Sequence, residues 1–243
     1  MDTIKISDRK NCKIIAHRGL SSLERENTVP AFIAAGNRSY FGIETDVHVT
    51  SDGKFIIFHD NKTERVAPGI NVVVDDTSFD ELRKISLSDK YGKGGRPDHR
   101  MPTLEEYISV CQHYEKICVL ELKNKMDPEA IERMVEEIKE TGYLESVIFI
   151  SFSIDNLVCL RKILPDQKIQ FLSGDPISNE LFDIMKQNKL DADVYHGILN
   201  SKEDVDFFHN SGMEVNVWTV DNAERAQSLI NWGIDYLTTN ALE

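Results

Sequence analysis

The feature that most constrains the fold is a regular alternation of short apolar runs with longer stretches of helical spacing. The runs have the length of strands buried on both faces, and glycines such as Gly142 and Gly233 stand where helices would end. Predicted strands cover residues 13–17, 42–49, 116–122, 147–151, 168–172, 192–195, 214–219 and 235–238. Predicted helices cover residues 28–35, 103–113, 128–141, 154–163, 179–187, 202–210 and 222–231.

Eight strands alternating with helices within 243 residues predict an α/β fold of the TIM (β/α)8 barrel type. A doubly wound open sheet is the alternative. It usually has fewer strands, and no glycine-rich phosphate loop follows the first predicted strand here.

One stretch, residues 52–102, interrupts the alternation. Asp52-Gly53 and the apolar run 54–58 predict a hairpin, and the polar, glycine-containing segment 93–98 predicts an exposed loop. We therefore expect a single domain over residues 1–243, with an insertion at 52–102 after the second strand. It would lie on the face that carries barrel active sites, unless it is a flexible excursion with no role.

The overall charge of −13 disfavours broad binding to nucleic acid or anionic membranes, which needs a surplus of Lys and Arg. No apolar run approaches the ~20 residues of a membrane span, so stable membrane insertion is not expected. The first twenty residues show no signal peptide. Four cysteines without a CxxC pair predict buried, reduced thiols rather than a zinc site, and a cytoplasmic location.

Two pairs of charged residues mark strand ends. Glu44 and Asp46 are two apart on a predicted strand, so they share a face, which His48 continues. Glu121 and Lys123 close another strand that is apolar until its end. Carboxylates facing a barrel interior need a counter-charge, and oxygen ligands favour Mg²⁺ or Ca²⁺. The alternative is that these carboxylates face solvent or pair with Arg and Lys side chains.

Two histidines also end apolar runs. His17 precedes Arg18, and His59 precedes Asp60, so the two imidazoles are candidates for an acid/base pair near neutral pH. Trp218 is either a core residue or an aromatic wall of the substrate pocket. The remaining histidines, predicted to be surface or loop residues, are His99, His113, His196 and His209. The Glu26-Asn27-Thr28 segment is predicted to have the structural role of a helix entry.

Nine short motifs along the chain carry a family resemblance. In order they are His17-Arg18-Gly19, Glu26-Asn27-Thr28, Glu44-Thr45-Asp46-Val47, Thr50-Ser51-Asp52-Gly53, His59-Asp60, Pro102-Thr103-Leu104-Glu105-Glu106, Glu121-Leu122-Lys123, Ser151-Phe152 and Trp218-Thr219-Val220. Together, over residues 13–239, they resemble the glycerophosphodiester phosphodiesterase family.

The resemblance implies a TIM barrel hydrolase that cleaves glycerophosphodiesters to glycerol 3-phosphate and an alcohol, in glycerol and lipid metabolism. It implies a divalent cation, Mg²⁺ or Ca²⁺, and it matches residues 52–102 to the family's extra segment. The residues carried over are His17 and His59 as acid/base catalysts, Glu44, Asp46 and Glu121 as metal ligands, and Arg18 and Lys123 as phosphate contacts.

The sequence departs from the family pattern at three places. Arg25 replaces a usual Pro, Arg65-Val66-Ala67 replaces Arg-Thr-Thr, and Thr238-Thr239-Asn240 replaces Thr-Asp. We expect none of these departures to touch the proposed catalytic residues, although the last could alter the barrel rim.

The chemistry leaves alternatives open. His17 is expected to take a proton from the nucleophile and His59 to protonate the leaving alkoxide, but the roles could be exchanged. The nucleophile could be water or a glycerol hydroxyl that forms a cyclic phosphate. The rival functions are lysophospholipase D or phospholipase-type cleavage of lipid phosphodiesters, and a non-catalytic barrel that binds phosphodiesters.

Overall fold

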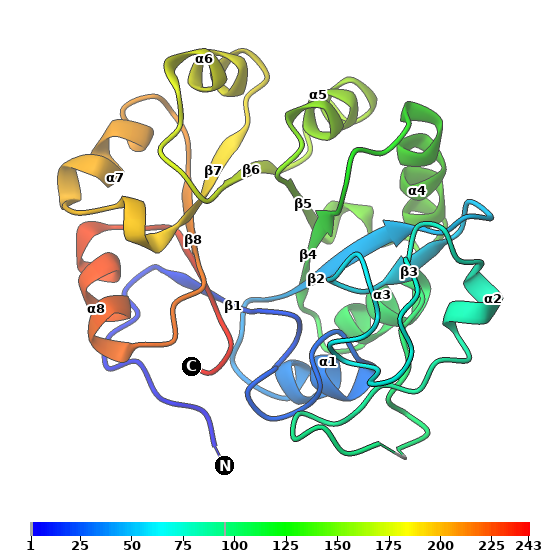
Figure 1. Cartoon of the computed structure of the whole chain (residues 1–243). Coiled ribbons are helices and arrows are strands. Elements are labelled where there is room, and N and C mark those ends of the chain that lie inside the picture. Colours follow the sequence, from blue (N-terminus) through cyan, green and yellow to red (C-terminus); the bar gives the residue numbers. More distant parts are fainter. Residues whose placement is uncertain (1, 95) are drawn as a thin grey trace.

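Eight parallel strands close into a barrel in the computed structural model, which describes residues 2–94 and 96–243 (Figure 1). The strands, in barrel order, are β1 (Lys13–Ala16), β2 (Gly42–Val49), β4 (Ile117–Leu122), β5 (Val147–Ser151), β6 (Ile169–Ser173), β7 (Asp191–Tyr195), β8 (Val215–Trp218) and β9 (Tyr236–Thr239). Pairing of β1 with both β2 and β9 closes the barrel. The predicted TIM barrel is confirmed, and the open sheet is excluded.

Helices cover the outside of the barrel (Figure 1). They are α1 (Val29–Gly36), α3 (Leu104–His113), α4 (Pro128–Glu140), α5 (Ile154–Ile163), α6 (Asn179–Gln187), α7 (Lys202–His209) and α8 (Ala223–Trp232), with 3-10 turns η1 (Leu144–Ser146) and η2 (His196–Ile198). Local signals set their ends. Thr28 caps α1, Thr103 and Glu106 form a capping box on α3, and Gly233 ends α8 with a left-handed φ of 98°.

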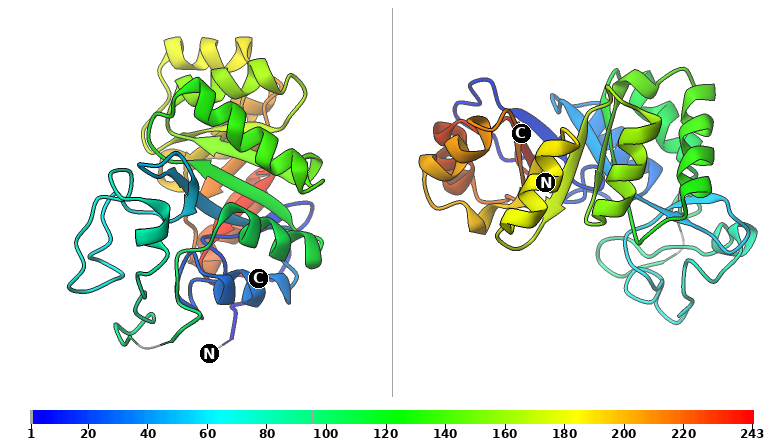
Figure 2. Two further views of the ribbon diagram at one scale, coloured as in Figure 1. Left: turned by 90° about the vertical axis from the view of Figure 1, so that its right-hand side faces the viewer. Right: turned by 90° about the horizontal axis from the view of Figure 1, so that it is seen from above.

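Residues after β2 form a hairpin and then an excursion from the barrel. β3 (Phe55–Ile57) pairs antiparallel with β2, as the Asp52-Gly53 turn predicts, and α2 (Phe79–Leu82) follows. The excursion packs on one side of the barrel, beside α1 (Figures 1 and 2). It is more than a polar loop, because its side chains form a separate small core of Ile56, Phe58, Val66, Ala67, Val74, Leu82, Ile85, Leu87 and Met101. The described residues of segment 93–98 are exposed, as expected, while Gly95 lies outside the described residues.

Alternate residues of the barrel strands point to different layers. One set packs under the helices, and the other fills the barrel interior, including Ile15, Val119, Ile148, Leu172 and Tyr236. This apolar interior supports the polar residues at the carboxyl ends of the strands. Across the described residues, no helix is both long and apolar enough to span a bilayer.

All four cysteines are free thiols. Cys12, Cys111 and Cys118 are buried, and Cys159 is partly exposed.

Candidate active site

Three buried carboxylates meet at the carboxyl ends of β2 and β4. Glu44 and Asp46 lie on β2, and Glu121 on β4 stands opposite Asp46 in the strand register. One carboxylate oxygen of each lies within 4.8 Å of the others. The two-residue spacing on β2 therefore does place both acids on the inner face, and solvent does not reach them.

Two cations accompany this carboxylate cluster. The Lys123 Nζ lies 2.8 Å from Glu121 and 3.4 Å from Asp46. Arg18 reaches Asp46 with its Nε at 3.6 Å, and its backbone N–H donates to Glu44 at 2.7 Å. The predicted pairing with Arg and Lys is thus present in part, but two cations face three carboxylates.

The β1–α1 loop that carries Arg18 has an unusual backbone. Arg18, Gly19 and Asn27 all have left-handed φ values, of 54°, 75° and 52°. A Cβ at Gly19 would lie 2.7 Å from the Ala31 backbone, so only glycine permits this approach of loop and helix. Strained φ values held by surrounding structure are typical of functional sites.

The same loop contributes two residues whose roles sequence reasoning missed. Asn27 donates to Asp46 at 2.7 Å and accepts a hydrogen bond from Thr45 at 2.6 Å. Glu26 binds Arg18 at 2.9 Å and also accepts from Arg65. The prediction that Glu26-Asn27-Thr28 is merely a helix entry is wrong for the first two residues, because the turn before the cap directs them toward the site.

Charge imbalance shapes the protonation of the cluster. Burial and the charge of Asp46 raise the pKa of Glu44 well above its usual range and that of Glu121 to about 8. Burial acts on Asp46 in the same direction, but Lys123 and Arg18 overcome it and lower the pKa of Asp46. Two cations for three buried carboxylates therefore favour the protonated forms of Glu44 and Glu121, unless more positive charge is supplied.

The donor set fits a divalent metal ion. It consists of carboxylate oxygens alone, which suits a hard cation such as Mg²⁺ or Ca²⁺. The Asp46 Oδ1 is buried and makes no hydrogen bond among the described residues; its charged contact is the Lys123 Nζ at 3.4 Å, which leaves room for an ion as a further partner. The three carboxylates could hold such an ion.

Both predicted catalytic histidines line the same cavity as Glu44 and Glu121. The His17 Nδ1 lies 2.8 Å from the Asn240 Oδ1, and the His59 Nδ1 lies 2.6 Å from the Asp60 Oδ1. Burial and Arg18 lower the pKa of His17 to about 4. Burial also lowers the pKa of His59, against the opposing effects of Asp46 and Asp60.

The cavity has a volume of about 140 Å³ and an aromatic side. Trp218 lines it and packs edge-on against Phe152, with ring centroids 5.6 Å apart. The Trp218 indole N–H donates to the backbone of Asp193, whose buried Oδ1 has no hydrogen-bond partner among the described residues. Sequence reasoning overlooked Asp193, although an Asp inside an apolar strand is a detectable signal.

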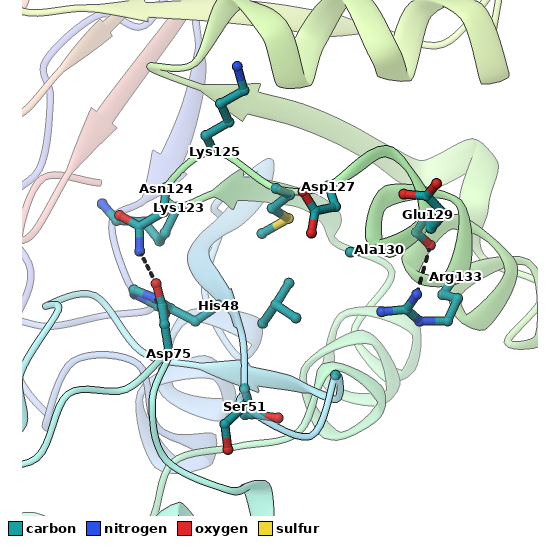
Figure 3. A pocket seen from close by; sticks show the side chains of 14 residues that line it. His48, Ser51, Asp75, Lys123, Asn124, Lys125, Asp127, Glu129, Ala130 and Arg133 are labelled. Carbon is teal, nitrogen blue, oxygen red and sulfur yellow. Dashed lines mark hydrogen bonds and ion pairs between the residues drawn. The ribbon is translucent and has the colours of Figure 1, made fainter.

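A second, wider groove of about 360 Å³ adjoins Lys123 outside the barrel mouth (Figure 3). His48 points into it from β2 and binds Asp75 of the excursion at 2.7 Å, and Asn124 also donates to Asp75 (Figure 3). The His48 Nε2 lies 3.4 Å from the backbone oxygen of His59. His48 thus ties the excursion to the segment that carries His59.

One further sequence expectation is wrong, and another holds only in part. One departure from the family pattern does touch the proposed catalytic set, because the Asn240 side chain binds His17. His99 lies in a loop, as predicted, but its side chain is 1% exposed and therefore not at the surface. His113, His196 and His209 are partly or fully exposed, as predicted.

A TIM barrel with carboxylates, cations and imidazoles around one cavity at its carboxyl mouth defines a class of barrel enzymes that act on anionic esters. The comparison with known proteins specifies the family. The sequence profile of the glycerophosphoryl diester phosphodiesterase family matches residues 17–243. A glycerophosphodiester phosphodiesterase of Caldanaerobacter subterraneus subsp. tengcongensis is 30% identical over 230 residues, which cover 93% of each chain.

Solved structures similar to this chain support the same family assignment. An Oleispira antarctica phosphodiesterase, in complex with its product sn-glycerol-3-phosphate, has a TM-score of 0.83 and 25% identity over 94% of this chain and 92% of that one. A glycerophosphodiester phosphodiesterase from Parabacteroides distasonis has a TM-score of 0.79 and 27% identity over 96% and 94%. The chain belongs to the glycerophosphoryl diester phosphodiesterase family and is an enzyme of that family, as the sequence motifs indicate.

Proposed function

We propose that this enzyme hydrolyses glycerophosphodiesters to glycerol 3-phosphate and an alcohol, with the help of a divalent cation. The observation that carries the proposal is that Glu44 and Glu121, which cluster with Asp46, line one cavity together with His17 and His59. The Oleispira antarctica relative was solved in complex with its product sn-glycerol-3-phosphate, which supports glycerol 3-phosphate as the product here.

The metal ligands in this proposal are Glu44, Asp46 and Glu121. A cation bound there would neutralise a non-bridging phosphate oxygen, which is usually a dominant contribution to this type of catalysis. Arg18 and Lys123 flank the carboxylates and add positive charge on the same side. Whether Mg²⁺ or Ca²⁺ is preferred depends on cavity size and ligand flexibility, and a metal titration decides it.

The two histidines transfer the protons. Burial and Arg18 lower the pKa of His17, so the ring is unprotonated at neutral pH, which is the state that a base needs to take a proton from the nucleophile. Burial lowers the pKa of His59, but the Asp60 carboxylate at its Nδ1 opposes this and favours the protonated ring that an acid needs to protonate the leaving alkoxide. Trp218 forms the aromatic wall against which the substrate packs.

The surroundings of the site support the remaining proposals. We assign residues 1–243 to one domain, in which the insertion at residues 52–102 supplies Arg65 and Asp75 as supports of the site. Four free thiols support a reducing compartment such as the cytoplasm.

Turnover of glycerophosphocholine tests the function. Activity should be lost in EDTA and return with Mg²⁺ or Ca²⁺. Full activity in chelator would refute the role of the metal, and no turnover with either ion would favour a non-catalytic barrel. Higher activity on lysophospholipid vesicles than on soluble diesters would favour the phospholipase-type alternative.

The nucleophile needs a separate experiment. Turnover in ¹⁸O-labelled water, with products followed over time, distinguishes direct attack by water from attack by a glycerol hydroxyl. Both routes finally place one label in glycerol 3-phosphate, but only attack by the glycerol hydroxyl first releases the alcohol with formation of an unlabelled cyclic phosphate. A cyclic phosphate that appears and is then consumed would exclude direct attack.

A further inference from the structure

Asn240 connects His17 to a carboxylate outside the cavity. Its Oδ1 lies 2.8 Å from the His17 Nδ1, and its Nδ2 lies 2.6 Å from the Asp221 Oδ2. Asp221 is held in turn by the backbone N–H of Asn240 at 2.7 Å and by the Thr239 hydroxyl at 2.9 Å, both at its Oδ1.

The partners of the Asn240 amide determine its orientation. An ionised carboxylate only accepts hydrogen bonds, so the side of the amide that faces Asp221 must be the NH₂ group. The amide oxygen then faces His17 and also accepts from the Ser21 hydroxyl at 2.7 Å. Because an amide oxygen cannot donate, the His17 Nδ1 must carry a hydrogen.

We propose that Asn240, oriented by Asp221, is a positioning residue that holds neutral His17 in its Nδ1–H tautomer. The remaining nitrogen, Nε2, is then unprotonated and makes no hydrogen bond with any residue among 2–94 and 96–243. The imidazole lines the cavity, so this lone pair is available to a nucleophile. The catalytic value of the tautomer depends on the proposed function, in which His17 is the base.

The two histidines differ in their supports. His59 donates to a carboxylate, which stabilises the protonated ring, whereas His17 donates to a neutral amide, which orients the ring without favouring its cation. The charged or titratable groups that act on His17 are Arg18 and His59, which disfavour its protonation, and Asp46, which favours it. Asp221 acts one step away, through Asn240.

Asp221→Asn is the sharpest test. This change places an NH₂ group where the Asp221 carboxylate now accepts a hydrogen bond from the NH₂ of Asn240. Two NH₂ groups cannot bond to each other, so the Asn240 amide should rotate until its oxygen faces position 221. Its NH₂ then faces His17 and requires an unprotonated Nδ1, which gives the Nε2–H tautomer. The matched control is Ser21→Ala, which removes one hydrogen bond to the Asn240 Oδ1 but gives no reason for rotation.

¹⁵N NMR of histidine-labelled, full-length, metal-free protein reads the tautomer directly, and loss of a signal in His17→Gln assigns it. We expect Nδ1–H in wild type and in Ser21→Ala, and Nε2–H in Asp221→Asn. An Nε2–H tautomer in wild type, or an unchanged tautomer in a folded Asp221→Asn protein, would overturn the proposal. Because this readout needs no turnover, its failure is distinct from failure to hydrolyse glycerophosphocholine.

Kinetics provides the second readout. Asp221→Asn should lower kcat by about 10- to 100-fold, as supports of catalytic groups typically do, with little change in KM. The exchanged pair Asp221→Asn with Asn240→Asp keeps the charge and places a carboxylate against the His17 Nδ1. It should recover most of kcat and move the acid limb of the kcat–pH profile upward by about 1 pH unit or more. No recovery, or an unmoved limb, would overturn the role of the amide.

Discussion

Glu121→Gln gives the strongest test of the charge balance in the carboxylate cluster. Burial and Asp46 raise the pKa of Glu121 from its usual 4.5 to about 8. Between these two values the folded protein binds more protons than the unfolded chain, so its stability falls as the pH rises through this window. The raised pKa of Glu44 acts in the same direction.

The size of the effect follows from the shift. At pH 7 the side chain of Glu121 is protonated in the folded protein but ionised in the unfolded chain, whose pKa of 4.5 lies about 2.5 pH units lower. Taking up this proton on folding costs on the order of 3 kcal/mol. Glutamine has nearly the same shape and does not pay this cost. In the absence of divalent ions, Glu121→Gln should therefore raise the free energy of unfolding at pH 7 by about 2–3 kcal/mol, and by little below pH 4.5.

Urea unfolding in EDTA between pH 4 and 8.5 measures this difference. The stability of wild type should decline toward pH 8 more steeply than that of the variant. Added Mg²⁺ or Ca²⁺ should stabilise wild type by about 2.7 kcal/mol at one hundred times its Kd, and the variant much less. The control is Glu132→Gln, at an exposed position on α4, which should change neither quantity.

Two results would refute this charge balance. If Glu121→Gln in EDTA is no more stable than wild type at pH 7, then folding does not force the Glu121 carboxylate to take up a proton. Equal stabilisation of variant and wild type by divalent ions would remove Glu121 from the metal ligands.

Four further substitutions test other parts of the site. His17→Ala or His59→Ala should each lower kcat by about 10²–10⁴, and near-normal kcat in both would end their assignment as the acid/base pair. Trp218→Ala removes the aromatic wall, so KM for glycerophosphocholine should rise more than kcat falls, and an unchanged KM would assign Trp218 to the core alone. Gly19→Ala forces a Cβ to within 2.8 Å of Ala31 at a left-handed φ, so thermal unfolding should show a loss of about 2 kcal/mol or more; wild-type stability would contradict the close approach.

Most of the barrel could be predicted from the sequence, because its strands are apolar on both faces and its helices carry strong end signals. Even the metal cluster could be predicted in part. The ends of parallel neighbouring strands meet at one edge, so Glu44, Asp46 and Glu121 had to lie close together once their strands were known. The four-residue helix α2 was missed because it is too short to show helical periodicity.

The supports of the site could not be predicted in the same way. Asn27 and Asn240 act through loops, where no repeating pattern indicates which way a side chain points. The positive φ of Asn27 directs its side chain toward Asp46. The hydrogen bond from Asn240 to Asp221 orients the Asn240 amide toward His17. Short polar side chains in loops are ordinary in any sequence, so their placement depends on tertiary structure.

The excursion after β2 is linked to the site through the β1–α1 loop as well as through His48 and Asn124 of the barrel, which bind Asp75. Arg25 of this loop donates to the Ser88 backbone at 2.6 Å, and Glu24 binds Arg96 at 3.0 Å. Glu26 accepts hydrogen bonds from Arg65, and although burial raises the pKa of Glu26, Arg65 and Arg18 together lower it to about 2. Because Arg18 depends on Glu26 and on the strained backbone of the same loop, ordering of the excursion fixes the guanidinium beside Asp46. An isolated ion pair at a protein surface stabilises little, but several that converge on one short loop reduce the conformational freedom of its catalytic side chains.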